Sequence, residues 1–194
     1  LEAVAGEQRS SPEDVWEDEL RRLEGIGAAL ESERAGEAFF AVDGLCGIHG
    51  GEVAGVMAAA REVAQMPVRI ATAPNRFAAF LAASRGSRLP RDLTGRRGEA
   101  IIPPRALRRF LAPFPVSTLA TRLQTRGPEA SALVIALKRL GLDTLGKLAT
   151  LSPDQAADRF GSLGLRALRL AQGEDESLRP REPHEELVAE IELL

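Results

Sequence analysis

The chain has 194 residues, of which 44% are apolar and 27% are charged. That is enough apolar material to bury one sizeable core or two small ones without metals or disulfides. The single cysteine, Cys46, excludes an internal disulfide, and there is no apolar run of about 18 residues, so we expect a cytoplasmic protein with no membrane contact.

The net charge of −3 conceals an uneven distribution along the chain. Residues 1–37 hold eleven acidic residues and four arginines, a net charge of −7. Residues 85–139 hold twelve basic and three acidic residues, a net charge of +9. Clustered arginines create a local field that attracts phosphate. A solvated basic face without a partner is the alternative, and charge alone does not decide between the two.

The N-terminal part predicts an acidic tail and one long amphipathic helix within residues 1–35. Ser11, followed by Pro12 and by Asp14 three positions on, is an N-cap signature. Apolar residues then recur at helical spacing to about Glu33.

Strand and helix patterns alternate in the next part of the chain. The predicted elements are a strand at 38–42, a helix at about 52–65, a strand at 68–72, a helix from its cap Asn75 to about Ser84, and a short strand at 100–103. This order predicts an α+β domain over residues 36–100, with helices covering one face of a small sheet.

A loop rich in glycine and arginine at residues 85–98 marks the predicted domain boundary. Residues 101–176 are expected to form an all-helical domain, in which Ser152 begins a helix and Gly173 ends one. Residues 177–194 read as a linker followed by an alternating strand pattern at 187–193.

Residues 137–149 predict two short helices joined by a glycine-containing turn, a helix-hairpin-helix. Backbone N–H groups at a helix N-terminus, beside cations, suit a nucleic-acid phosphate, so we expect contact with the DNA backbone and no base reading. The alternative is that the glycines serve only close helix packing. The predicted DNA-binding residues are Lys138, Arg139, Gly141, Gly146 and Lys147.

Four parts of the sequence, in order, resemble the Y-family translesion DNA polymerases, and within them the ImuB-like branch that has shed its catalytic groups. The matching segments are residues 36–44 for the palm strand, 70–79 for the Asn-Lys segment, 101–104 with 110–116 for the start of the thumb, and 140–160 with 169–175 for the thumb's helix-hairpin-helix and the helix after it. The resemblance implies a partial palm at 36–100, a helical thumb at 101–176, and a linker to a little-finger domain at 177–194.

The departures from the family pattern concern catalysis. Gly36 stands where the family has the Asp of its Asp-Glu pair, so that Glu37 alone remains. A single carboxylate cannot hold the two metal ions that nucleotide transfer requires. The resemblance therefore implies no catalytic residue and no metal site in this chain, with magnesium as a cofactor only if the full-length protein is active.

Two further motifs are altered relative to the family. Asn75 and Arg76 are the remnant of a nucleotide-binding pair, with Arg in place of Lys, and Phe80 replaces a second Lys. The first phosphate-gripping hairpin, expected at residues 127–131, is degraded, and Glu129 would repel a phosphate there.

Three functions from different classes remain open. The favoured one is a catalytically inactive accessory protein of DNA repair, translesion synthesis and the SOS response. It would bind primer-template or duplex DNA, and its protein partners would include a replicative or translesion polymerase and a sliding clamp. The second is a fragment of an active translesion DNA polymerase. The third is a helix-hairpin-helix module that binds protein.

Overall fold

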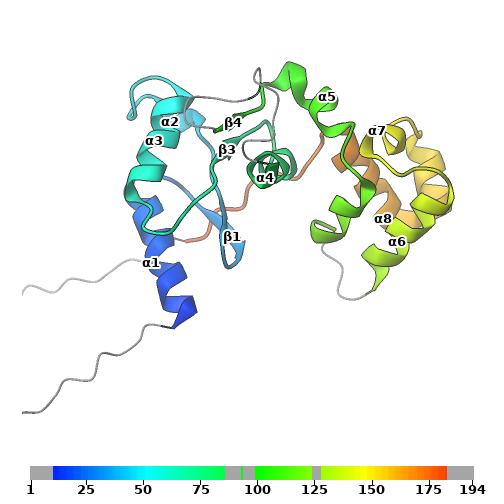
Figure 1. Cartoon of the computed structure of the whole chain (residues 1–194), viewed down its shortest axis with the longest axis horizontal. Helices are drawn as coiled ribbons and strands as arrows, with labels where there is room; N and C mark the ends of the chain where they lie inside the picture. The colour runs from blue at the N-terminus through cyan, green and yellow to red at the C-terminus, as the bar shows by residue number, and fades with distance from the viewer. Residues whose placement is uncertain (1–10, 86–92, 94–98, 124–127, 183–194) are drawn as a thin grey trace, which may run out of the picture. The chain divides into compact units, whose positions relative to one another are not determined.

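The computed structural model describes residues 11–85, 93, 99–123 and 128–182. Figure 1 labels most of its helices and strands. The chain divides into two compact units: unit 1 contains Leu1–Val68 and Leu178–Leu194, and unit 2 contains Arg69–Ser177. The predicted strand at 187–193 and most of the predicted loop at 85–98 lie outside the described residues. The palm and thumb limits expected from the sequence stay predictions.

Unit 1 combines three helices with one antiparallel hairpin. Its elements are α1 (Pro12–Gly25), β1 (Glu31–Arg34), β2 (Glu37–Phe39), α2 (Asp43–Cys46) and α3 (Val53–Val63). β1 pairs with β2 across a turn that contains Gly36, whose φ of 85° favours glycine. Its core consists of Leu20, Ala28, Leu30, Leu45 and Val56.

The first helix begins as predicted but ends earlier. The Ser11 side chain accepts from the Asp14 N–H, and Asp14 accepts from the Ser11 N–H, which confirms the capping box. The helix stops at Gly25, and Gly27 has a φ of 89°, a left-handed conformation that turns the chain. The prediction of a helix to Glu33 is therefore wrong.

Unit 2 begins with a parallel strand pair and continues as a helical body. Its elements are β3 (Ala71–Thr72), α4 (Arg76–Arg85), β4 (Ala100–Ile101), η4 (Pro104–Ala106), α5 (Leu107–Leu111), η5 (Val116–Thr121), α6 (Glu129–Arg139), α7 (Leu145–Leu148) and α8 (Pro153–Gln172). The helical character predicted for the second half of the chain is confirmed in the described residues. Its core is built largely from leucine, phenylalanine and alanine side chains of these helices.

The strands are shorter than predicted and form two sheets instead of one. β1 and β2 make one pair, and β3 and β4 make another, with Ala71 opposite Ala100. The Ile102 N–H still donates to the carbonyl of Thr72, but Pro103 has no N–H and the pairing ends there. Among the described residues, the single small sheet expected from the sequence is therefore replaced by one strand pair in each unit.

The last helix has the predicted cap at each end. The Ser152 side chain accepts from the Gln155 N–H in a capping box, and Gly173 closes α8 with a φ of 88°. Gly161, with φ 64° and ψ −156°, interrupts the helical geometry inside α8. None of the helices in the described part of the chain is long and apolar enough to cross a membrane.

Candidate nucleic-acid interface

Lys138 and Arg139 lie exposed in the last turn of α6. The chain then turns at Gly141, whose φ is 74° and whose N–H donates to the carbonyl of Lys138. The Leu142 N–H donates to the carbonyl of Leu137, which completes the helix end. Cations at a helix C-terminus are favoured by the helix dipole, so this turn presents two positive side chains to solvent at little cost.

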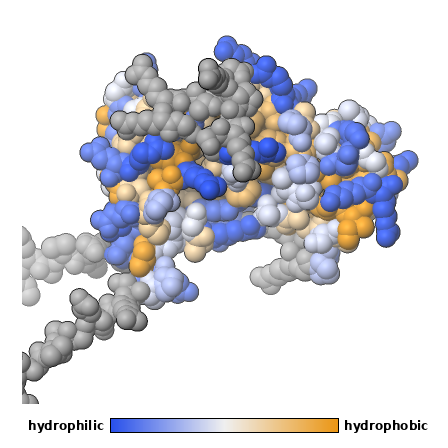
Figure 2. Space-filling model, in the orientation of Figure 1, coloured by the Kyte–Doolittle hydropathy of each residue, from blue (hydrophilic) through white to orange (hydrophobic). Residues whose placement is uncertain are grey.

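The two cations stand beside exposed apolar side chains. Ile135 is 54% exposed and Leu140 is 52% exposed, and Figure 2 shows hydrophobic and hydrophilic surface side by side over this part of unit 2. Among the described residues, Lys138 and Arg139 have no ion-pair partner. Their charges are therefore available to an anion.

The N–H groups at the start of α7 are bonded within the chain. The Leu145 N–H donates to the carbonyl of Phe114 (2.8 Å), and the Gly146 N–H donates to the carbonyl of Ala112 (3.0 Å). The N–H of the next residue donates to the Thr144 hydroxyl. These donors are therefore not open to a phosphate, in contrast to the sequence-based expectation. Any phosphate contact at this turn depends on side-chain charge.

Local geometry disfavours any other residue at both glycines of the predicted hairpin, Gly141 and Gly146. A Cβ on Gly146 would lie 3.0 Å from the Cβ and from the carbonyl oxygen of Ala112. Gly141 has open space around it, but its positive φ strains any other side chain. The packing alternative therefore accounts for Gly146 directly.

Lys147 is paired with a carboxylate. Its Nζ lies 2.6 Å from Oδ1 of Asp143, and both side chains are 58% exposed. The hydrogen bond from Lys147 holds the pKa of Asp143 below its usual range. The pair leaves Lys147 a weaker anion ligand than Lys138 or Arg139. We call Lys138, Arg139, Gly141 and Lys147 the α6–α7 corner.

Two arginines of the basic segment stack on phenylalanine rings. The Arg122 guanidinium carbon lies 3.7 Å from the ring centre of Phe80, and that of Arg85 lies 4.6 Å from the ring centre of Phe114. These side chains contribute to packing through cation–π contact. Five other arginines of the segment lie outside the described residues: Arg88, Arg91, Arg96, Arg97 and Arg126.

The degraded hairpin expected at residues 127–131 is described from Pro128 onward. Pro128 is the N-cap of α6 and makes no side-chain cap, and Glu129 opens the helix as an exposed acidic residue. Gly127 lies outside the described residues.

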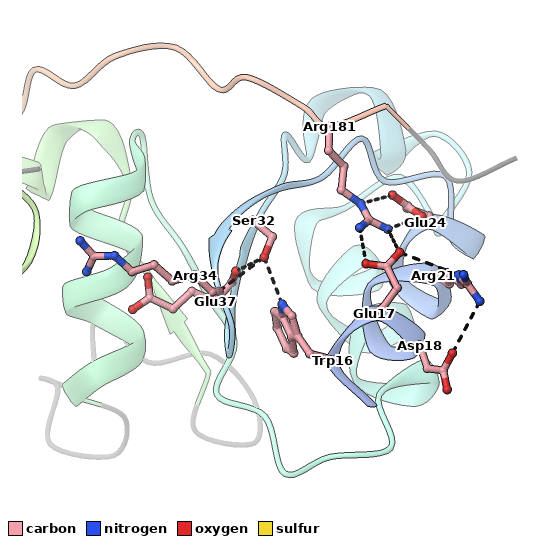
Figure 3. A network of polar contacts seen from close by, with 9 residues as sticks. All are labelled: Trp16, Glu17, Asp18, Arg21, Glu24, Ser32, Arg34, Glu37 and Arg181. Atoms are coloured by element: carbon pink, nitrogen blue, oxygen red, sulfur yellow. Dashed lines mark hydrogen bonds and ion pairs between the residues drawn. The ribbon is translucent and has the colours of Figure 1, made fainter. Parts of the chain in front are cut away.

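Glu37 lies at the start of β2, half-buried, beside the Arg34 side chain (Figure 3). Its carbonyl accepts a hydrogen bond of 2.9 Å from the Ser32 hydroxyl, which in turn accepts from the Trp16 indole N–H (Figure 3). This chain of bonds fixes the hairpin against α1.

Asn75 and Arg76 are engaged at the first turn of α4. The side-chain oxygen of Asn75, Oδ1, accepts a hydrogen bond from the Ala78 N–H. The side-chain nitrogen of Asn75, Nδ2, donates to the backbone carbonyl of Gly173. Arg76 Nη2 lies 3.5 Å from Asp175 Oδ1. The sequence alone does not reveal this contact of Asp175, because segments so far apart leave no local pattern.

Comparison with known proteins shows similarity to DNA polymerases in sequence and in fold. The chain is 29% identical over 168 residues to DNA polymerase IV of Caulobacter vibrioides, covering 82% of this chain and 38% of that protein. In fold it is similar to Dbh in a ternary complex, with a TM-score of 0.57, and to DinB from Sulfolobus solfataricus, with a TM-score of 0.56. Both are 19% identical to it and match 84% of this chain. No family model matches.

The chain is similar to Y-family DNA polymerases. Its fold of helices with small sheets is similar to the Y-family polymerase fold. It spans 38% of the curated relative, and 47% and 46% of the two solved structures.

No group of three or more His, Cys, Asp or Glu side chains in the described residues is placed to hold a metal ion. Glu37 stands beside Gly36, which offers no ligand, and beside the cationic Arg34.

Proposed function

We propose that this chain belongs to a catalytically inactive, ImuB-like member of the Y-family that assists lesion bypass in DNA repair and the SOS response. In this proposal it holds the DNA backbone, or a partner protein, while another polymerase supplies the chemistry. The observation that carries the proposal is the pairing of a fold similar to that of Y-family polymerases with a glycine, Gly36, at the position where the sequence resemblance expects the Asp that precedes Glu37.

The α6–α7 corner supports the DNA-binding half of the proposal. Lys138 and Arg139 are exposed, adjacent and unpaired within the described residues. Arginine and lysine side chains of this kind bind phosphate without reading the base sequence. The corner and the helices that flank it correspond to the proposed helix-hairpin-helix, which would act through its cations and not through the N–H groups of α7.

The second candidate function is an active translesion DNA polymerase of which this chain is one part. The observation that favours it is coverage: the chain spans 38% of DNA polymerase IV, so other parts of a longer protein would carry metal ligands. Magnesium-dependent primer extension by the full-length protein separates the two functions. If the protein is catalytically inactive, we expect no primer extension. Primer extension that is lost in the variant Glu37→Gln would establish that the protein is an active polymerase.

The third candidate is a helix-hairpin-helix module that binds protein. Exposed Ile135 and Leu140 beside the cations favour it, because apolar surface of this kind contributes to protein contacts. This candidate predicts no salt-dependent affinity for duplex DNA.

The salt dependence of duplex binding tests the favoured proposal. If phosphates are neutralised, the logarithm of the affinity falls with the logarithm of salt concentration, with a slope of about −0.9 per phosphate. The double variant Lys138→Ala with Arg139→Ala should reduce that slope by about one to two units. The matched control, Arg159→Ala with Arg169→Ala, removes the same charge from exposed positions on α8 and should leave the slope unchanged.

The outcomes divide the candidates clearly. A smaller slope in the Lys138 and Arg139 variant alone supports backbone binding at the α6–α7 corner. Equal slopes in both variants and the parent chain remove these residues from the contact. Absence of duplex binding at low salt favours the protein-binding module.

A further inference from the structure

The N-terminus of α4 is occupied by an acidic side chain from the far end of unit 2. Asp175 Oδ2 accepts the Phe77 N–H at 3.0 Å, and Asp175 Oδ1 lies 3.5 Å from Arg76 Nη2. Oδ1 also accepts the N–H of Glu176 at 2.8 Å. One carboxylate therefore bonds both the first turn of α4 and its own segment.

A second contact fastens the same two segments. Asn75 accepts the Ala78 N–H at 2.9 Å and donates its amide to the carbonyl of Gly173 at 2.8 Å. Two successive N–H groups of the first turn, those of Phe77 and Ala78, thus have side-chain acceptors. Neither is left for an external anion.

The turn after α8 makes this arrangement possible. Gly173 adopts a φ of 88°, which strains any other residue, and a Cβ there would lie 2.7 Å from a methyl carbon of Leu107. The turn brings Asp175 back to α4, where its side chain is 10% exposed and that of Arg76 is 17% exposed. The charges face each other largely out of water, which strengthens their attraction.

A helix N-terminus beside a guanidinium group attracts an anion, because unbonded N–H groups and the helix dipole both favour negative charge. In this chain the anion is part of the polypeptide. We propose that Asp175 is a built-in anion that closes the N-terminus of α4 to phosphate, so that Asn75 and Arg76 act as an intramolecular latch and not as ligands of a nucleotide.

The latch deepens the proposed function, on which it rests, because a chain that does not bind a triphosphate at this position has no nucleotide to transfer. Its test is independent of DNA binding and of primer extension. Failure of the latch would therefore leave the α6–α7 corner untouched, and failure of the corner would leave the latch untouched.

Titration of the whole chain with inorganic triphosphate at low salt, followed by NMR, provides the first measurement. The amide signals of Phe77 and Ala78 should not shift in the parent chain. In Asp175→Ala they should shift in a saturable way, because Arg76 and the Phe77 N–H lose their internal anion. Saturable shifts in the parent chain, or none in Asp175→Ala, would overturn the proposal.

Amide hydrogen exchange supplies the second measurement. Asp175→Ala should speed exchange at Phe77 by about tenfold, the typical effect of losing one charge-assisted hydrogen bond. The control Glu174→Ala removes an exposed neighbouring carboxylate and should leave this rate unchanged. In Asp175→Asn, which keeps an acceptor of the same shape, the exchange rate at Phe77 should lie between the rates in Asp175→Ala and in the control. Equal rates at Phe77 in Asp175→Ala and in the control would contradict the latch.

Discussion

Arg181 and Glu17 lie 164 positions apart in the sequence, yet Nη1 of the arginine is 2.7 Å from Oε2 of the glutamate (Figure 3). Glu24, about two turns further along the same face of α1, accepts two more bonds from the same guanidinium. The Arg181 N–H also donates to the carbonyl of Leu30. One residue thus fastens the segment that follows unit 2 onto the first helix and the hairpin of unit 1.

Arg181→Ala should lower the free energy of unfolding of unit 1 by about 1.5 kcal/mol, because a forked set of charge-assisted bonds is lost. The figure is modest because Glu17 is 37% exposed and solvent screens the pair. Trp16 is the only tryptophan of the chain and lies in α1, so its fluorescence in urea reports unit 1 specifically.

Arg181→Lys serves as the control for geometry. Lysine keeps the charge but cannot bond two carboxylates with a planar fork. It should recover less than half of the lost stability. Full recovery would mean that the charge alone, without the fork, holds the segment.

Glu19→Gln should destabilise unit 1 by about 2 kcal/mol, the typical cost of losing hydrogen bonds to a charged group. The Glu19 side chain is buried, and its Oε1 accepts the N–H groups of Gln65 and Met66, while Oε2 pairs with Arg22 at 2.8 Å. The glutamine keeps the shape but not the charge. Urea denaturation followed by Trp16 fluorescence at neutral pH measures the loss.

The same carboxylate makes the stability of unit 1 depend on acid. Burial alone would raise the pKa of Glu19, but the bonds from Met66, Arg22 and Gln65 outweigh it and hold the pKa below its ordinary value of 4.5. The contribution of Glu19 is therefore present above about pH 4.5 and is lost as the pH falls through the folded-state pKa. Unfolding free energies measured between neutral and strongly acidic pH should fall less steeply in Glu19→Gln than in the parent chain. Parallel curves would contradict this role.

Gly146→Ala should destabilise unit 2 by about 1 to 3 kcal/mol, because the new Cβ meets the backbone of Ala112. Gly44→Ala is the matched control, since a Cβ there meets nothing within 4 Å and the residue lies in a helix of unit 1. Circular dichroism during thermal unfolding measures both. A Gly146 variant as stable as the control would return this glycine to the list of phosphate-binding candidates.

Arg122→Ala should cost about 0.5 to 1 kcal/mol of unit 2 stability through loss of its stacking on Phe80. Because the guanidinium is used in packing, the salt slope of duplex binding should remain that of the parent chain. A slope reduced by about one unit would instead make Arg122 a phosphate contact.

Local signals in the sequence predicted the helix caps well. The Ser11 and Ser152 boxes, the Asn75 cap and the Gly173 stop are all short-range patterns in which a side chain bonds a backbone group a few residues away. The resemblance to Y-family polymerases is likewise confirmed by the 29% identity to DNA polymerase IV over 168 residues.

The sequence-based predictions were wrong where contacts between distant parts of the chain determine the local structure. β1 consists of Glu31, Ser32, Glu33 and Arg34, which shows no apolar alternation, and only its pairing with β2 makes it a strand. The roles of Asp175 and Arg181 depend on partners about a hundred residues or more away, and no local pattern reveals them. The N–H groups of α7 looked open in the sequence because their acceptors on Ala112 and Phe114 come from another turn of the chain.

The contact between Arg181 and α1 has a consequence for the order in which the two units are completed during synthesis. Unit 2 is one continuous stretch, Arg69–Ser177, whereas unit 1 draws on segments on both sides of it. A ribosome therefore finishes every residue of unit 2 before it makes the arginine that secures the first helix. Domains fold as units during translation, so α1, although it is synthesised before unit 2, is secured only after unit 2 is complete.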